Sequence, residues 1–121
     1  MDNIRWANVI DNLNLPDRFS DKLKKDLLYI LKSQISSLEF IVLFGSCVTG
    51  KLRVTSDIDL MIITRDVLDQ TLRGDIASEL AEPKSSIPTD VIFYTVDAVK
   101  TGKSLFLKQI MKEGVVIWKR V

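Results

Sequence analysis

The chain has 121 residues, with 17 basic and 16 acidic side chains, and 46% of its residues are hydrophobic. This length and composition are typical of a globular protein, so we expect one domain over residues 1–121. One cysteine and no histidine exclude a disulfide framework, a Cys/His zinc site and a histidine-activated nucleophile. The net charge of +1 argues against a nucleic-acid coat protein, and we expect no direct nucleic-acid binding.

The apolar segments predict a cytoplasmic protein without membrane attachment. The first residues lack the charged and apolar regions of a signal peptide. The longest apolar run, residues 40–44, is far shorter than the roughly 20 residues of a membrane span. The lone Cys47 fits a reducing compartment.

Helices are predicted over three segments. Ser20 or Asp21 can cap a helix over residues 22–34, whose leucines and isoleucines form one broad stripe. Its lysines are expected on a solvated face (Lys22, Lys24, Lys25). A second helix is expected from a cap at Asp66 through Glu82, where Pro83 follows. The third covers residues 104–112 and is ended by a cap at Gly114.

Short apolar runs predict the strands. Residues 40–44 and 58–63 are continuous apolar runs, and their length and β-branched content favour buried strands over helices. Residues 90–96 and 115–118 predict two further strands. Helices and strands in this order predict an α/β (α+β) domain with a small mixed sheet flanked by helices.

Gly45-Ser46 follows the first strand directly. A glycine there lets the backbone turn sharply and bring its amide groups close to an anion, typically a phosphate. Ser46 adds a hydroxyl donor. Taken alone, the pair is equally typical of an ordinary turn.

Asp57 and Asp59 are two residues apart at the start of a strand, so their side chains point to the same face. A divalent cation between them would remove the repulsion of the two carboxylates. Such oxygen ligands suit Mg²⁺ or Mn²⁺, which are typically held by one or two carboxylates and by substrate phosphates. The alternative for Asp57 is a turn or capping role. Asp90 would complete a three-carboxylate cluster if its strand lies alongside, and its alternative is a turn residue.

Gly45-Ser46, ten further residues, Asp57-Ile58-Asp59 and the later Asp90 together resemble the signature of the DNA polymerase β-like nucleotidyltransferase superfamily. The resemblance covers nearly the whole chain. The small size narrows it to minimal nucleotidyltransferases, the MNT or MntA-like antitoxin type, which are commonly paired with a HEPN-domain toxin. It implies the polymerase β-like nucleotidyltransferase fold.

The resemblance also implies the roles of these residues. Gly45 and Ser46 would hold the triphosphate of ATP. Asp57 and Asp59 would bind two Mg²⁺ ions, or Mn²⁺, and Asp90 would share one ion and activate the acceptor hydroxyl. Many relatives have arginine where Thr49 stands, so a phosphate-facing cation is expected from Arg53 instead; a solvated loop charge is the alternative.

By this resemblance the chain is an enzyme that moves AMP from ATP to a hydroxyl, a tyrosine of a HEPN-family toxin, and so acts as an antitoxin in complex with that partner. Two alternatives stay open: a catalytically silent antitoxin that neutralises its partner by binding, and a nucleotidyltransferase acting on a small molecule such as an aminoglycoside. Residues 98–121 carry six basic groups and one acidic group, which fits either an acidic partner or a solvated helix.

Overall fold

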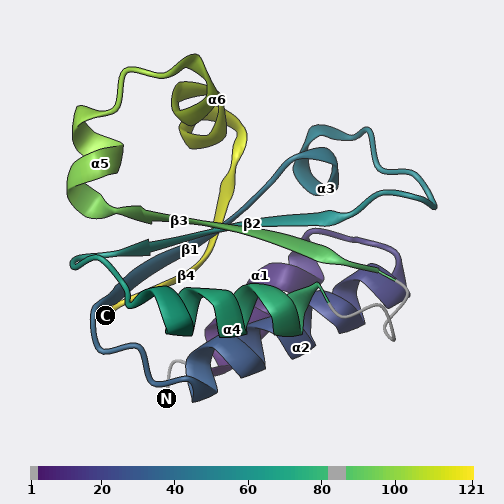
Figure 1. Ribbon diagram of the computed structural model, residues 1–121. Coiled ribbons are helices and arrows are strands. Elements are labelled where there is room, and N and C mark those ends of the chain that lie inside the picture. The colour runs from purple at the N-terminus through teal and green to yellow at the C-terminus, as the bar shows by residue number, and fades with distance from the viewer. Residues whose placement is uncertain (1–2, 82–86) are drawn as a thin grey trace.

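The computed structural model describes residues 3–81 and 87–121 and places helices on both faces of one four-stranded sheet (Figure 1). In chain order the elements are α1 (Asn3–Asn12), α2 (Asp17–Lys32), β1 (Leu38–Phe44), α3 (Ser46–Thr49), β2 (Ile58–Thr64), α4 (Gln70–Leu80), β3 (Thr89–Thr95), α5 (Val96–Thr101), α6 (Leu105–Glu113) and β4 (Val115–Lys119). The expected α/β class is confirmed. Within the described ranges, no helix has the length and apolar character needed to cross a membrane.

The sheet has the strand order β3-β2-β1-β4. β1 runs antiparallel to both of its neighbours, whereas β2 and β3 are parallel. Parallel neighbours need a crossover connection, which α4 supplies. The starts of β2 and β3 therefore lie side by side, and β3 is an edge strand. All four expected strands are present, with their ends shifted by no more than two residues.

The larger hydrophobic cluster lies on the sheet face that α1, α2 and α4 cover (Figure 1). Leu23, Leu27 and Ile30 of α2 recur at helical spacing and are fully buried. They pack in one cluster with strand residues such as Leu60 and Ile62, which are also fully buried. Each such side chain contributes about 1.5–3 kcal/mol on burial, so this layer holds the fold together.

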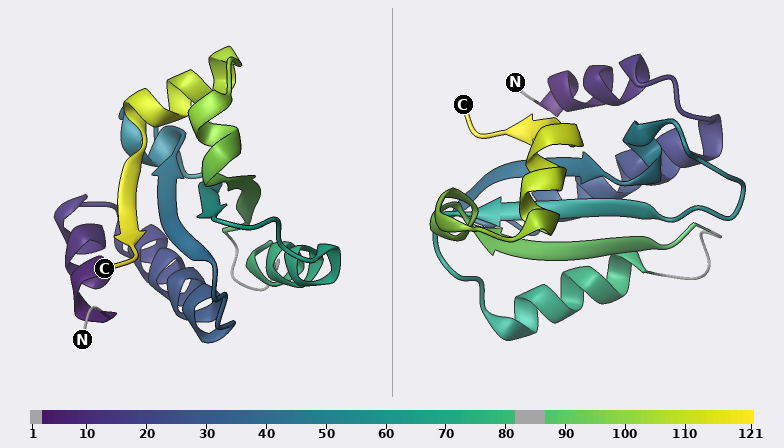
Figure 2. Two further views of the ribbon diagram at one scale, coloured as in Figure 1. Left: turned by 90° about the vertical axis from the view of Figure 1, so that its left-hand side faces the viewer. Right: turned by 90° about the horizontal axis from the view of Figure 1, so that it is seen from above.

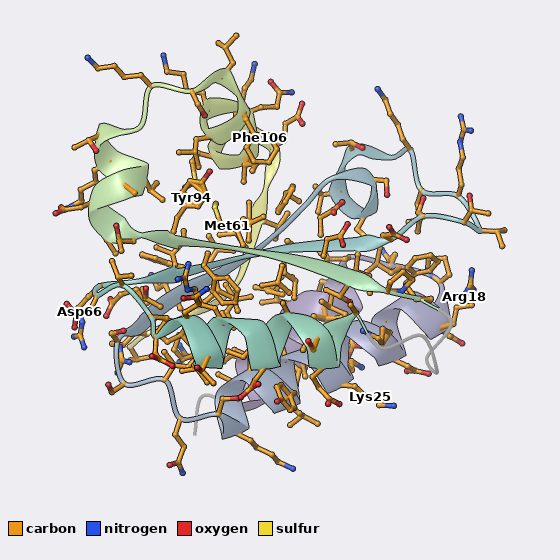
Figure 3. The ribbon with its side chains drawn as sticks, viewed as in Figure 1. Arg18, Lys25, Met61, Asp66, Tyr94 and Phe106 are labelled. Carbon is orange, nitrogen blue, oxygen red and sulfur yellow. The ribbon has the colours of Figure 1, made fainter. Side chains whose placement is uncertain are left out.

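The opposite face carries α3, α5 and α6, and α6 crosses over the strands when seen from above (Figure 2). Its smaller cluster combines Met61 and Ile63 of β2 with Leu107 and Ile110 of α6. Met61 and Tyr94 point from the sheet toward these helices (Figure 3). The residues at the starts of β2 and β3 on this face are polar instead, which marks the location of the candidate site.

The start of α2 differs from the sequence expectation. The helix begins at Asp17, directly after Pro16, rather than after a cap at Ser20 or Asp21. Proline fits this place because it lacks an amide hydrogen and its φ suits the entry to a helix. Ser20 and Asp21 lie inside the helix, so their expected capping role is wrong.

The start of α4 also differs. Asp69 is the N-cap, and its Oδ2 accepts hydrogen bonds from two backbone amides of the first turn, so the helix begins at Gln70 rather than after Asp66. Of several aspartates in this region, only the one with free amides within reach acts as the cap. The expected helix end at Glu82 and Pro83 lies outside the described residues.

The other helices are partly as expected. α6 is confirmed, and the Ser104 hydroxyl accepts a hydrogen bond from the Leu107 amide. Gly114 ends it, but with φ −68° rather than in a left-handed conformation. A Cβ at Gly114 would lie 2.7 Å from both the Ile110 carbonyl oxygen and Val42 Cγ1, so close packing against the backbone requires this glycine. α1, α3 and α5 were not expected. α3 and α5, with four and six residues, are too short to show a helical period.

The environment of Lys22 also differs from the sequence expectation. Its side chain was expected in solvent, but the residue is only 6% exposed and forms an ion pair of 2.6 Å with the buried Asp26. Lys25 is exposed, as expected, and points away from the sheet (Figure 3). An isolated helix pattern cannot show that a charged residue finds partners on other elements.

Candidate active site

Asp59 and Asp90 stand opposite each other at the starts of two parallel strands. Asp59 of β2 is the register partner of Asp90 of β3. Alternation along β2 puts Asp59 on the same face as Met61, the face that carries α6. The sequence alone left open whether β3 would lie beside β2, and the structure brings these two predicted site residues together.

Gly45 lies against Asp59. Phe44, the last residue of β1, pairs with Asp59, so the chain turns away from the sheet at this carboxylate. Gly45 has φ +76° and ψ −152°, a combination that essentially only glycine adopts. A Cβ built on it would lie 2.3 Å from Asp59 Oδ2. Both the conformation and the close approach therefore require glycine here.

The short helix α3 begins directly after this glycine. The amides of Val48 and Thr49 donate to the Gly45 carbonyl at 3.0 and 3.2 Å, which closes the turn. Ser46 is the first residue of α3 and is half-buried. The expected Gly-Ser turn is therefore present beside the carboxylates, and its role toward a phosphate remains a prediction.

Electrostatics also connect the three aspartates. Burial, together with smaller effects of the Asp90 and Asp57 charges, raises the pKa of Asp59 to about 6. Like charges close together disfavour ionisation of the most buried member. The metal-free site therefore carries an electrostatic penalty that a bound cation would relieve.

Asp57 lies in the loop just before β2, and it is half-buried. The same loop carries Arg53, whose side chain is exposed and whose amide donates to the Ser56 hydroxyl at 2.8 Å. The Arg18 guanidinium of α2 donates to the Val54 carbonyl at 2.6 Å and so ties the loop tip to the body of the protein. Arg53 is thus placed on a tethered loop, and its contact with phosphate stays a prediction.

An open pocket of about 670 Å³ lies next to the Asp59–Asp90 pair. Phe44 and Phe106 border it, with their rings edge to face and their centroids 6.2 Å apart. Phe106 extends from α6 on the same side of the sheet (Figure 3) and is 53% exposed. Neither aromatic was predicted as a site residue: Phe44 was assigned only to the strand before Gly45, and nothing in the local pattern of α6 indicates that Phe106 faces the carboxylates. Of the predicted site residues, Asp59 and Asp90 line this pocket, whereas Gly45, Ser46, Arg53 and Asp57 do not.

The surroundings of Cys47 disfavour its thiolate form. The residue is buried, and desolvation, with a smaller effect of the Asp59 charge, raises the pKa of its thiol to about 11. A thiol protonated at neutral pH is unreactive. We therefore interpret Cys47 as a small packing residue.

The donor set suits a hard divalent cation that the substrate helps to bind. Within residues 3–81 and 87–121, no three Asp, Glu, Cys or His side chains converge closely enough to hold a metal by themselves. Mg²⁺ is commonly bound by one or two carboxylates together with substrate phosphates and water. Asp59 and Asp90, with Asp57 adjacent, supply oxygen ligands of that kind.

Comparisons with known proteins agree with this geometry. The family model described as "Polymerase beta, Nucleotidyltransferase" matches residues 25–121. The chain is also similar to protein adenylyltransferase MntA of Shewanella oneidensis, with 30% identity over 92 residues. That match covers 76% of this chain and 62% of the relative, so the chain spans less than two thirds of that protein.

Solved structures show the same fold. A chain in the crystal structure of a toxin–antitoxin with AMP-PNP superposes with a TM-score of 0.60 and 25% identity, covering 79% of this chain and 73% of that one. A candidate nucleotidyltransferase from Sulfolobus solfataricus has a TM-score of 0.53 and 20% identity, covering 99% and 89%, and shows the fold alone. The resemblance inferred from the Gly-Ser and aspartate motif is confirmed.

Proposed function

The chain belongs to the Polymerase beta nucleotidyltransferase family, and we propose that it transfers AMP from ATP to a hydroxyl group of a partner protein with the help of Mg²⁺. The observation that carries the proposal is the register pairing of Asp59 with Asp90 directly beside the glycine turn at Gly45. Paired carboxylates next to a turn that can receive a phosphate are what phosphoryl chemistry with a divalent cation requires.

The three aspartates would hold the metal ions. When bound, two divalent cations stabilise both the attacking and the leaving oxygens of an in-line displacement. Asp57 and Asp59 would each contribute carboxylate oxygens. Asp90 would share an ion and accept the proton of the attacking hydroxyl, a role in which a carboxylate substitutes for the missing histidine.

The glycine turn would hold the donor nucleotide. The backbone conformation that only glycine adopts at Gly45 lets the chain turn directly into α3, whose first amides would face the polyphosphate beside Asp59. The Ser46 hydroxyl would donate to a phosphate oxygen, and Arg53 would add a positive charge from the loop before β2. The pyrophosphate would leave from this side of the carboxylates.

A protein acceptor is supported by the relatives. The curated relative is named a protein adenylyltransferase, and the structural neighbour with 25% identity is a toxin–antitoxin with AMP-PNP. We therefore propose a HEPN-family toxin as the partner, a tyrosine hydroxyl as the acceptor, ATP as the donor, and the cytoplasm as the compartment. Modification would neutralise the toxin, which makes this chain the antitoxin of the pair.

A labelling experiment tests the proposal. The purified chain is incubated with α-labelled ATP, Mg²⁺ and a lysate of its own organism, and labelled macromolecules are separated by size. The comparison is the double variant Asp57→Asn/Asp59→Asn. A matched control, Asp66→Asn/Asp75→Asn, removes the same charge from exposed aspartates away from the site. Chelation of Mg²⁺ should abolish labelling, and added Mg²⁺ should restore it.

The outcomes separate the three functions. A labelled protein with the intact chain and the control, but not with the site variant, supports protein adenylylation. No label from any of the four α-labelled nucleoside triphosphates, in a chain that still captures a partner, would leave a binding antitoxin. Label in a small soluble product instead of a protein would indicate a small-molecule nucleotidyltransferase.

A further inference from the structure

A buried polar cluster joins three elements beneath the candidate site. Lys22 Nζ of α2 donates to Asp26 Oδ1 at 2.6 Å, to the Thr89 hydroxyl at 2.8 Å and to the Leu80 carbonyl at 3.0 Å. The Thr89 hydroxyl in turn donates to Asp26 Oδ2. The exposed fractions are 6% for Lys22, 3% for Asp26 and 1% for Thr89. α2, the end of α4 and the start of β3 are thus tied together.

Every hydrogen-bonding group of the Lys22 and Asp26 side chains has a partner, but the cluster does not necessarily stabilise the fold. All three ammonium hydrogens of Lys22 have acceptors, and both carboxylate oxygens of Asp26 have donors. Removing two charges from water is nevertheless costly, and well-packed apolar residues are often as stabilising as a buried ion pair. The cluster's directional hydrogen bonds fix the position of the groups they join, which an apolar contact does less strictly.

The position that it fixes is the first residue of β3. Thr89 precedes Asp90, and alternation along the strand sends its side chain to the opposite face, into the cluster. β3 is an edge strand, and β2 is its only strand neighbour within the described part of the chain. Just before the two strands pair, the Ile58 amide donates to the Pro88 carbonyl at 3.1 Å. This end of the strand needs a second attachment because Asp90 faces Asp59, and the two carboxylates repel.

We propose that Lys22, Asp26 and Thr89 are positioning residues that anchor the start of β3 and hold Asp90 opposite Asp59 for cation binding. The cluster acts through the backbone of Thr89, a residue that also borders the pocket but whose hydroxyl is bonded to Lys22 and Asp26. The consequence for the cation rests on the proposed function. The anchoring of β3 follows from the hydrogen bonds alone. The anchoring and its effect on cation binding can therefore be tested separately.

The test compares two variants of Thr89 with a control variant at another buried threonine. Thr89→Val removes the hydroxyl and keeps the shape, whereas Thr89→Ser keeps the hydroxyl. Thr64→Val is the matched control, because Thr64 is equally buried, at 3% exposure, at the far end of β2, where its hydroxyl donates to the Asp66 carbonyl. The double variant Lys22→Met/Asp26→Leu removes both charges together and serves if Thr89→Val does not fold.

The first readout is amide hydrogen exchange of the folded protein. Thr89→Val is expected to lower the protection of the Ile58 amide by about tenfold, the factor for one lost buried hydrogen-bond partner. The Arg65 amide, which donates to the Ser37 carbonyl at the other end of β2, should keep its protection. Equal loss at both amides, or no loss at Ile58, overturns the anchoring role.

The second readout is binding of Mn²⁺ in the presence of AMP-PNP, followed by the electron paramagnetic resonance signal of free Mn²⁺. We expect Thr89→Val to weaken binding by about tenfold, Thr89→Ser to restore it, and Thr64→Val to leave it unchanged. Unchanged Mn²⁺ affinity in Thr89→Val overturns the effect on the site. A wild-type chain that binds no Mn²⁺ refutes the proposed function instead, and hydrogen exchange then decides the anchoring by itself.

Discussion

Gly45 and Asp59 occupy adjoining space at the end of β1, where a Cβ on the glycine would lie 2.3 Å from Asp59 Oδ2. No real Cβ approaches an oxygen that closely, so a side chain at position 45 must displace the carboxylate. The same glycine has a backbone conformation that other residues avoid. The turn and the carboxylate therefore depend on each other.

Substitution of Gly45 should distinguish the effect of backbone strain from the effect of displacing the Asp59 carboxylate. Gly45→Ala combines a backbone strain of about 1–3 kcal/mol with a clash against Asp59, so we expect lower stability and loss of nucleotide transfer. Gly50→Ala is the matched control: Gly50 has φ +79°, but nothing lies within 4 Å of its added Cβ. It should lose about 1–2 kcal/mol of stability and keep its activity. Denaturant unfolding and the labelling assay measure both quantities, and equal activity of the two variants would contradict the interpretation.

Asp59→Asn should stabilise the metal-free protein at pH 7.5 while abolishing transfer. It removes a carboxylate whose ionisation is disfavoured by burial and by Asp90 and Asp57. Allowing for solvent screening of this half-buried group, we expect a gain of about 1 kcal/mol in the free energy of unfolding. Transfer should fall by more than about 100-fold, since a cation ligand is lost. Asp75→Asn, on the exposed face of α4, should change neither; a lower melting temperature for Asp59→Asn would refute the prediction.

The Asp59 carboxylate also predicts how the stability of the fold depends on pH. Its pKa is about 6 in the folded chain against an ordinary value of 3.8, so between these values the folded state holds a proton that the unfolded state has lost. The free energy of unfolding should therefore fall as the pH rises from about 4 to 6, by about 1–2 kcal/mol after screening. Asp26 contributes with the same sign, because burial raises its pKa as well.

Urea unfolding of the metal-free protein across pH 4 to 7 measures how the free energy of unfolding changes with pH. Asp59→Asn provides the comparison, and its free energy of unfolding should fall less over this range. A wild-type stability that rises through this window would show that the Asp59 carboxylate is not destabilised by its neighbours. Mg²⁺ with AMP-PNP should raise the melting temperature more at pH 7.5 than at pH 5, where the carboxylate is largely protonated.

Cys47 should be inert. Because its thiol is buried and has a pKa of about 11, iodoacetamide should label it at pH 7.5 only when the chain is denatured. Cys47→Ala should keep its transfer activity and lose about 1 kcal/mol of stability or less, since it shortens a buried side chain by one atom. Mass spectrometry of the native and the denatured protein checks the labelling. Loss of activity in a folded Cys47→Ala variant would contradict a purely packing role.

The strands illustrate what can be predicted locally. Residues 40–44 and 58–63 are apolar runs bounded by Gly45 and by Asp57, so their length and composition were sufficient to place β1 and β2. Helix starts were less predictable. Ser20, Asp21 and Asp66 are good caps by residue type, but Pro16 and Asp69 occupy the positions where the helices begin.

The motif of Gly45, Ser46, Asp57 and Asp59 is contained in one short segment, so the sequence by itself determined the candidate site and the family. The tertiary structure decided which distant groups complete it. Asp90 lies opposite Asp59 because α4 returns the chain parallel to β2, and Lys22 is buried because partners from α4 and β3 surround it. The spacing of apolar residues along a helix or strand predicts which of its faces is buried. Contacts between different elements depend on how the whole chain packs.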